Sequence, residues 1–183
     1  MTTTLTTATL GRYAGNMGRF HAIVEASFTR PNDTTQYASG DGITNSTSAP
    51  SAIVFEDCTR WFGTSALLIG AAMVKSTTST SNASFILHLW NDVPPQIPND
   101  NAAYSPTARA NFSNYVGAMT VDKTTAAFTY GDGIGKQFVM PINSLPFTIS
   151  ATSRRLYGVL QANANYTPGA LEQFKFKLYI EQN

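Results

Sequence analysis

The stretch from Ser84 to Trp90 constrains the fold of this chain most, because it carries large side chains on both faces of an extended segment. Successive strand residues point to opposite sides of a sheet. Three of the apolar residues therefore face one way, while Ile86, His88 and Trp90 face the other. A strand that is apolar on both faces lies inside a sheet rather than at its rim. We therefore predict a buried central strand here.

Other segments also have the pattern of strands. Phe20 to Phe28 and Phe174 to Glu181 alternate apolar and polar residues, which predicts half-buried strands. Thr64 to Lys75 is rich in Ala and Leu, but it has no charge before Lys75 and so no solvated helical face. We predict a buried strand there too. Further strand signals cover Gly42–Ile43, Ala52–Phe55, Tyr115–Val121, Ala126–Tyr130, Gln137–Met140, Phe147–Ser150 and Leu156–Ala162.

About ten short strands at near-regular spacing predict an all-β fold. We expect a two-sheet antiparallel β-sandwich with jelly-roll-like connections. The 183 residues suit a single domain, placed at 19–183, preceded by an extended N-terminal arm at 1–18 that is rich in threonine and glycine. One helical turn is expected within Tyr104–Asn111, where Ser105-Pro106 has the pattern of a cap followed by proline.

Composition excludes several classes of function. Charged residues make up 13% of the chain, about half the usual share, and the net charge is +1. The long-range attraction on which nucleic-acid binding depends is therefore missing. The longest apolar run, Ala66 to Val74, is shorter than the roughly 20 residues that span a bilayer, and Met1 to Leu10 lacks the features of a signal peptide. We expect a soluble protein made in a cytoplasm, without a membrane or nucleic-acid partner.

Catalytic groups are sparse. The single cysteine, Cys58, excludes an internal disulfide and is expected in the core, and His21 and His88 have no metal-ligand spacing. Gly131 to Lys136 lacks the glycine spacing and the Ser or Thr of a phosphate loop, so we interpret it as a hairpin turn. We expect no enzymatic activity, metal or cofactor. A site built from scattered acids stays open, as does calcium binding by loop aspartates such as Asp100.

Three segments resemble a known family. The run Phe28–Asp41, followed by Phe85–Trp90 and Pro98–Ala103, resembles a family of small virion structural proteins of tailed bacteriophages. The resemblance covers about the first 110 residues and the strand pattern of the rest. It implies a β-sandwich or jelly-roll fold and a cement or head-decoration role.

The resemblance implies a specific place in the virion. The protein would be a non-enzymatic decoration protein on the capsid surface that binds and stabilises the major capsid protein as a homo-oligomer, a dimer or a trimer. Candidate contact residues lie in the arm, in the loop after the first strand and in the proline-rich loop: Arg12, Tyr13, Arg19, Arg30, Asp33, Tyr37, Asp41, Pro94, Pro95, Ile97 and Tyr104. The alternative is a carbohydrate-binding or receptor-binding module of a virion, in which Trp61 and Trp90 would stack on sugars.

Overall fold

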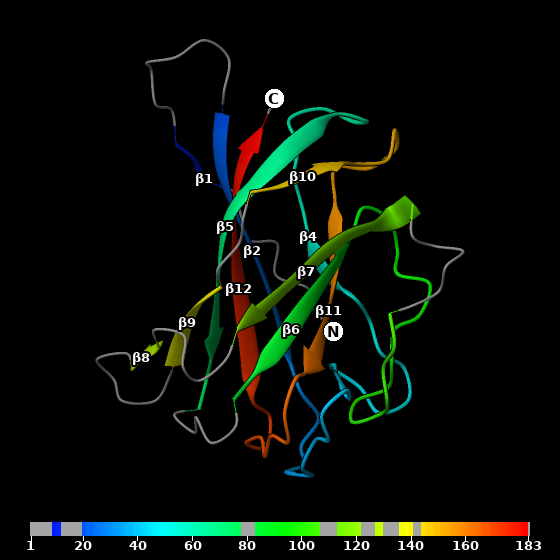
Figure 1. Ribbon diagram of the computed structural model, residues 1–183, viewed down its shortest axis with the longest axis vertical. Coiled ribbons are helices and arrows are strands. Elements are labelled where there is room, and N and C mark those ends of the chain that lie inside the picture. The colour runs from blue at the N-terminus through cyan, green and yellow to red at the C-terminus, as the bar shows by residue number, and fades with distance from the viewer. Residues whose placement is uncertain are drawn as a thin grey trace.

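The structure is a computed structural model that describes residues 9–11, 20–77, 83–106, 113–121, 127–129, 136–140 and 144–182. These residues form two antiparallel β-sheets packed face to face and contain no α-helix (Figure 1). The fold is therefore all-β and has the form of a β-sandwich, as the alternating strand patterns predict.

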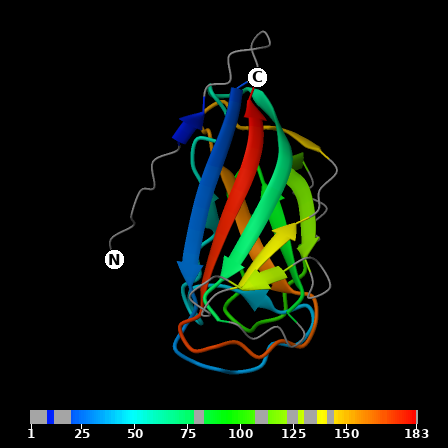
Figure 2. The ribbon, with the colours of Figure 1, turned by 90° about the vertical axis from the view of Figure 1, so that its left-hand side faces the viewer.

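The first sheet has seven strands, and three long ones lie side by side at its centre (Figure 2). Its order is β1-β2-β12-β5-β9-β8. The strand β10 pairs with the first part of β5, and β9 pairs with the last part. Its strands are β1 (Thr9–Gly11), β2 (Phe20–Thr29), β5 (Ser65–Lys75), β8 (Ala127–Thr129), β9 (Lys136–Met140), β10 (Leu145–Thr148) and β12 (Gln173–Gln182).

The second sheet has five strands in the order β3-β11-β6-β7, with β4 also paired to β11. Its strands are β3 (Gly42–Ile43), β4 (Ile53–Phe55), β6 (Phe85–Trp90), β7 (Tyr115–Val121) and β11 (Leu156–Ala162). The chain passes from β2 to this sheet, back to β5, across to β6 and β7, and later across to β11 and back to β12. Jelly-roll connectivity stays the finer prediction.

The central strand is confirmed as β6, which pairs with β11 on one side and β7 on the other. Its residues Phe85, Leu87 and Leu89 lie in the core between the sheets. The Phe85 ring meets Phe174 of β12 edge to face, with 5.6 Å between ring centroids. Burial of apolar side chains from both sheets supplies the main driving force for this packing.

The other strand predictions differ from the structure mainly at their ends. Thr64 to Lys75 forms β5 and not a helix. The strand predicted at Phe147–Ser150 begins earlier, at Leu145, and includes Pro146. Proline cannot donate to a ladder and is therefore found mainly in edge strands, and β10 is paired on one side only.

Parts of the predicted arm and of two predicted turns lie outside the described residues. Within the predicted arm, Thr9–Gly11 forms β1, whose backbone pairs with His21–Ile23 of β2. The rest of the arm lies outside, as do most of the predicted helical turn and the turn at 131–135. Cys58 is a buried free thiol, as expected, and burial raises its pKa.

Candidate functional site

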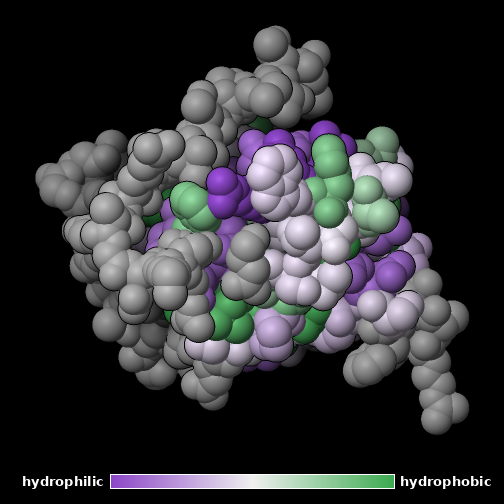
Figure 3. All heavy atoms as spheres, turned by 90° about the horizontal axis from the view of Figure 1, so that it is seen from above, coloured by the Kyte–Doolittle hydropathy of each residue, from purple (hydrophilic) through white to green (hydrophobic). Residues whose placement is uncertain are grey.

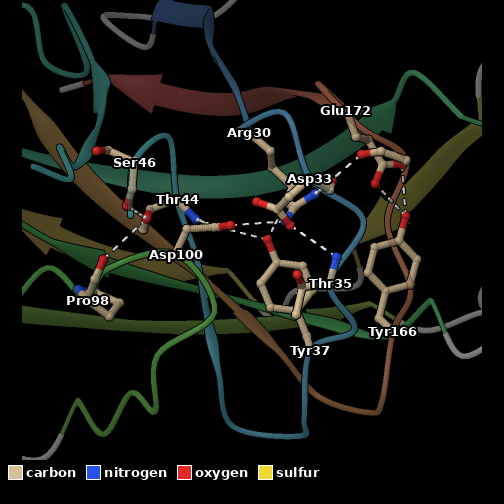
Figure 4. A network of polar contacts seen from close by, with 11 residues as sticks. Arg30, Asp33, Thr35, Tyr37, Thr44, Ser46, Pro98, Asp100, Tyr166 and Glu172 are labelled. Carbon is tan, nitrogen blue, oxygen red and sulfur yellow. Dashed lines mark hydrogen bonds and ion pairs between the residues drawn. The ribbon is translucent and has the colours of Figure 1, made fainter. Parts of the chain in front are cut away.

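A buried ion pair joins two loops at the lower end of the sandwich in Figure 1, where β2 ends and β12 begins. Arg30 directly follows β2, and its Nη2 lies 3.0 Å from Oδ2 of Asp100, with both side chains fully buried. The Tyr37 hydroxyl accepts from Arg30 Nε and donates to Asp100 Oδ1 at 2.7 Å (Figure 4). Asp100 also accepts from the Thr44 backbone N–H at 2.9 Å. This carboxylate therefore fastens the proline-rich loop, residues 91–104, to the segment after β2.

A second buried ion pair lies at the same end. Lys75, the last residue of β5, places Nζ 2.9 Å from Oε1 of Glu172, and both side chains are fully buried. The Tyr166 hydroxyl donates to the same carboxylate, at 2.6 Å to Oε2, and the Thr77 hydroxyl donates to Oε1. A buried charge is tolerated only when it is paired and its remaining bonds are made. Both conditions hold for this pair.

The two ion pairs are joined through aromatic and backbone contacts. The rings of Tyr37 and Tyr166 are stacked, with 6.4 Å between centroids, and their backbones exchange bonds of 2.9 and 3.2 Å. The Arg30 N–H donates to the Glu172 carbonyl oxygen at 3.0 Å. Burial raises the pKa of both phenols, so they stay protonated and able to donate. This lower-end network therefore locks together loops that are far apart in the sequence.

A histidine-centred cluster lies on the outer face of the second sheet. Gln161 Nε2 donates to the carbonyl oxygens of Tyr104 at 2.7 Å and Gly40 at 3.0 Å, so its Oε1 is turned toward His88. His88 Nε2, 3.0 Å away, then carries the proton, and Nδ1 accepts from the Tyr115 hydroxyl at 3.0 Å. Burial lowers the pKa of His88, which favours this neutral form.

Trp90 and Tyr104 close this cluster against solvent. Trp90 is 1% exposed, so it offers no face on which a sugar could stack. The Tyr104 hydroxyl is buried and has no hydrogen-bond partner among the residues that the structure describes. The cluster therefore packs the proline-rich loop against the sheet.

The upper end of the sandwich, where β5 begins, presents an aromatic pair. Trp61 and Phe62 are each 62% exposed, and both lie in the turn between β4 and β5. The hydroxyls of Thr59 and Thr64 both donate to the Trp61 carbonyl oxygen at 2.8 Å. Figure 3 looks onto this end, where hydrophobic side chains lie beside hydrophilic ones. This turn combines exposed apolar surface with a fixed backbone.

The structure separates the predicted contact residues into three groups. Arg12, Tyr13 and Arg19 lie outside the described residues. Side chains that are buried in this chain, and so hold loops instead of presenting surface, are Arg30, Tyr37, Pro94 and Tyr104. Those at least partly accessible are Asp33, Asp41, Pro95 and Ile97.

Several important residues were not singled out from the sequence. The sequence suggests only calcium binding for Asp100, whereas in the structure it pairs with Arg30. Lys75 has one visible signal, since it is the only charge in a long apolar strand. For Phe62 and Arg60 the sequence gives no such signal, because turn residues have no periodicity that separates exposed from buried aromatics.

Comparisons with known proteins identify no relative. No family model, no curated protein and no solved structure matches this chain. Among the residues that the structure describes, no group of three or more His, Cys, Asp or Glu side chains is arranged to hold a metal ion. No helix in that part of the chain has the length and apolar character needed to cross a bilayer.

Proposed function

We propose that this protein is a non-enzymatic decoration protein of a bacteriophage capsid, which binds the major capsid protein on the shell surface and stabilises the shell. The observation that carries the proposal is the lower-end network. Two fully buried ion pairs, Arg30–Asp100 and Lys75–Glu172, hold the loops of one end in a single arrangement. A protein that braces a shell needs this kind of internal stiffness.

Rigid loops favour binding because little conformational entropy is lost on association. The low charge of the chain, 13% charged residues and a net charge of +1, favours contacts made by shape and neutral hydrogen bonds. Many identical copies on a shell add further stability by simultaneous engagement, so each contact can be modest. We propose a dimer or trimer with jelly-roll connectivity as the binding unit, located on the virion.

The resemblance of Phe28–Asp41 to phage virion proteins supports the same role. Within that segment, Arg30 and Tyr37 are buried and bonded to Asp100, which itself lies in the third resembling segment, Pro98–Ala103. Two of the three segments that carry the resemblance thus meet in one network. The contacts of Arg30 and Tyr37 with Asp100 therefore give these two segments a common structural role in this fold.

Rebinding to shells tests the proposal. Shells are purified from a phage whose gene for this chain has been deleted, mixed with the purified full-length protein and sedimented. We expect the protein to sediment with the shells and to saturate at a fixed ratio to the major capsid protein. Failure to bind, or binding that never saturates, would overturn the proposed function.

A second candidate is a carbohydrate-binding or receptor-binding module, favoured by the exposure of Trp61. Trp90 is excluded from that role by burial, which leaves Trp61 at the upper end as the tryptophan that could stack on a sugar. Glycan-array binding that is lost on Trp61→Ala, together with no binding to shells, would favour this candidate over the decoration role.

A further inference from the structure

Trp61 and Phe62 are exposed to an extent that the fold does not require. Each is 62% exposed, and they are adjacent in the chain, whereas the other strongly exposed large apolar residues, such as Val93 and Leu171, lie elsewhere. Trp and Arg are enriched among the residues that dominate binding energy in protein interfaces. An adjacent aromatic pair beside an arginine is therefore a candidate contact surface.

The backbone beneath this pair is held rigidly. The Gly63 N–H donates to the Ser150 carbonyl oxygen at 3.0 Å, which fastens the turn to the loop between β10 and β11. Gly63 has φ of 65°, and a Cβ there would lie 3.3 Å from Ala151 Cα. Both features favour glycine at this position. The aromatic pair is thus presented in a fixed orientation.

Charge at the upper end is unevenly compensated. Arg155 Nε lies 2.7 Å from Glu56 Oε2, and Arg154 pairs with Asp57. Arg60 stacks on Phe20, with its guanidinium carbon 4.0 Å from the ring centroid, but no carboxylate of the described residues forms an ion pair with it. Among the described residues, Arg60 therefore carries a positive charge beside the exposed aromatic pair that no carboxylate neutralises.

We propose that Arg60, Trp61 and Phe62 form the docking tip of this protein, which inserts into an apolar hollow with a carboxylate on its rim. This inference rests on the proposed function, and the hollow belongs to the major capsid protein. The two aromatic rings fill the hollow, and the Arg60 guanidinium pairs with the rim carboxylate. Such a charge pair at an interface selects the partner and its orientation.

A protein partner fits this end better than a lipid surface. The carboxylates of Glu56 and Asp57 are both partly exposed beside the tip, with side-chain exposures of 48% and 47%. These carboxylates are paired with Arg154 and Arg155, so the described residues leave one net positive charge at this end, and the cluster of basic residues that favours anionic membrane surfaces is missing. A hollow in a protein partner has to accommodate only two aromatic rings and one guanidinium cation.

Rebinding of variants to shells tests the docking tip. Trp61→Ala, Phe62→Ala and Arg60→Glu are compared with two controls at the lower end, Leu171→Ala and Gln36→Ala. Leu171 is 56% exposed and its N–H donates to the Pro31 carbonyl oxygen, and Gln36 is exposed next to Tyr37. We expect each tip variant to bind shells about tenfold more weakly or worse, with Trp61→Ala the largest, while both controls bind as the unaltered protein does. Thermal unfolding of every variant verifies folding.

Tryptophan fluorescence of the unaltered protein gives a second test of the docking tip. Trp61 is exposed and Trp90 is buried, so a change in tryptophan emission on binding reports on Trp61. We expect the emission to shift to shorter wavelength when shells are added, because water leaves the ring. The absence of a shift on saturated shells would overturn the docking tip.

The outcomes separate this inference from the proposed function. If the unaltered protein does not bind shells, the proposed function fails and the docking tip fails with it. If the protein binds but the tip variants bind equally well, or lose no more than the controls, only the docking tip is overturned. It is also overturned if the tip variants lose self-association in sedimentation velocity, or binding to phosphatidylserine vesicles, and keep shell binding.

Discussion

Lys75 and Lys177 show how burial decides what a charged residue contributes to this fold. Each places Nζ 2.9 Å from a glutamate oxygen. The Lys75–Glu172 pair is fully buried, whereas the side chains of Lys177 and Glu25 are 48% and 43% exposed. An exposed pair gains little because water and salt screen it, while a buried pair cannot lose one partner without leaving an unpaired charge.

We predict that Lys75→Met lowers the free energy of unfolding by about 3 kcal/mol, because Glu172 is left buried without a cation. The matched control, Lys177→Met, removes a lysine from the neighbouring strand and should cost less than about 1 kcal/mol. Denaturant unfolding of both variants measures the difference. Equal losses for the two lysines would contradict the assignment of Lys75 to a buried pair.

His88 makes stability depend on pH in a defined direction. Burial lowers the pKa of His88 in the folded state below its ordinary value of 6.5, so the unfolded chain binds the proton more readily. The stability that the neutral, buried His88 contributes to the fold is therefore complete above pH 6.5 and is lost as the pH falls toward the folded-state pKa. The groups around the ring are the neutral side chains of Gln161, Tyr115, Tyr104 and Trp90.

We predict that His88→Gln flattens the dependence of unfolding free energy on pH below 6.5. The other histidine, His21, is exposed on β2, so His21→Gln should keep the slope of the unaltered protein. Denaturant unfolding of the three proteins between neutral and mildly acidic pH gives the comparison. A slope that disappears with His21→Gln instead would refute the role of His88.

At the scale of elements, the long strands were predictable from the sequence and the contacts between loops were not. Alternation along β2 and β12 shows in the residues themselves, because one face of each strand must be buried, and β6 is apolar on both faces because both are buried. Arg30 and Asp100 are 70 residues apart, and Lys75 and Glu172 are 97 apart. No local pattern connects such residues, so the sequence does not predict the lower-end network and does not separate the buried Arg30 and Tyr37 from surface contact candidates.

We predict that Asp100→Asn loosens the proline-rich loop. The variant removes the charge that pairs with Arg30 and weakens the bond that fixes the Thr44 N–H. Backbone amide exchange should become faster in residues 42–46 and 99–104. The control Asp92→Asn changes an exposed aspartate of the same loop, and exchange in these two segments should stay as it is. Unchanged exchange in the Asp100→Asn protein would show that the carboxylate does not hold the loop.

At the scale of the whole molecule, the two ends of the sandwich differ. The lower end is fastened by two buried ion pairs, and the upper end exposes an aromatic pair on a fixed turn. Between the two ends, one apolar core fills the space between the sheets. This division is the structural basis of the proposed decoration role, in which the surface of the protein and not a reaction centre would act.

The number of copies of this chain in a virion tests that role most directly. Quantitative mass spectrometry of purified particles, from the phage that we propose as the source of the chain, compares its amount with that of the major capsid protein. Our account predicts many copies, in a fixed ratio to the capsid subunits. Absence of the chain from the particles, or its presence in only a few copies, would contradict it.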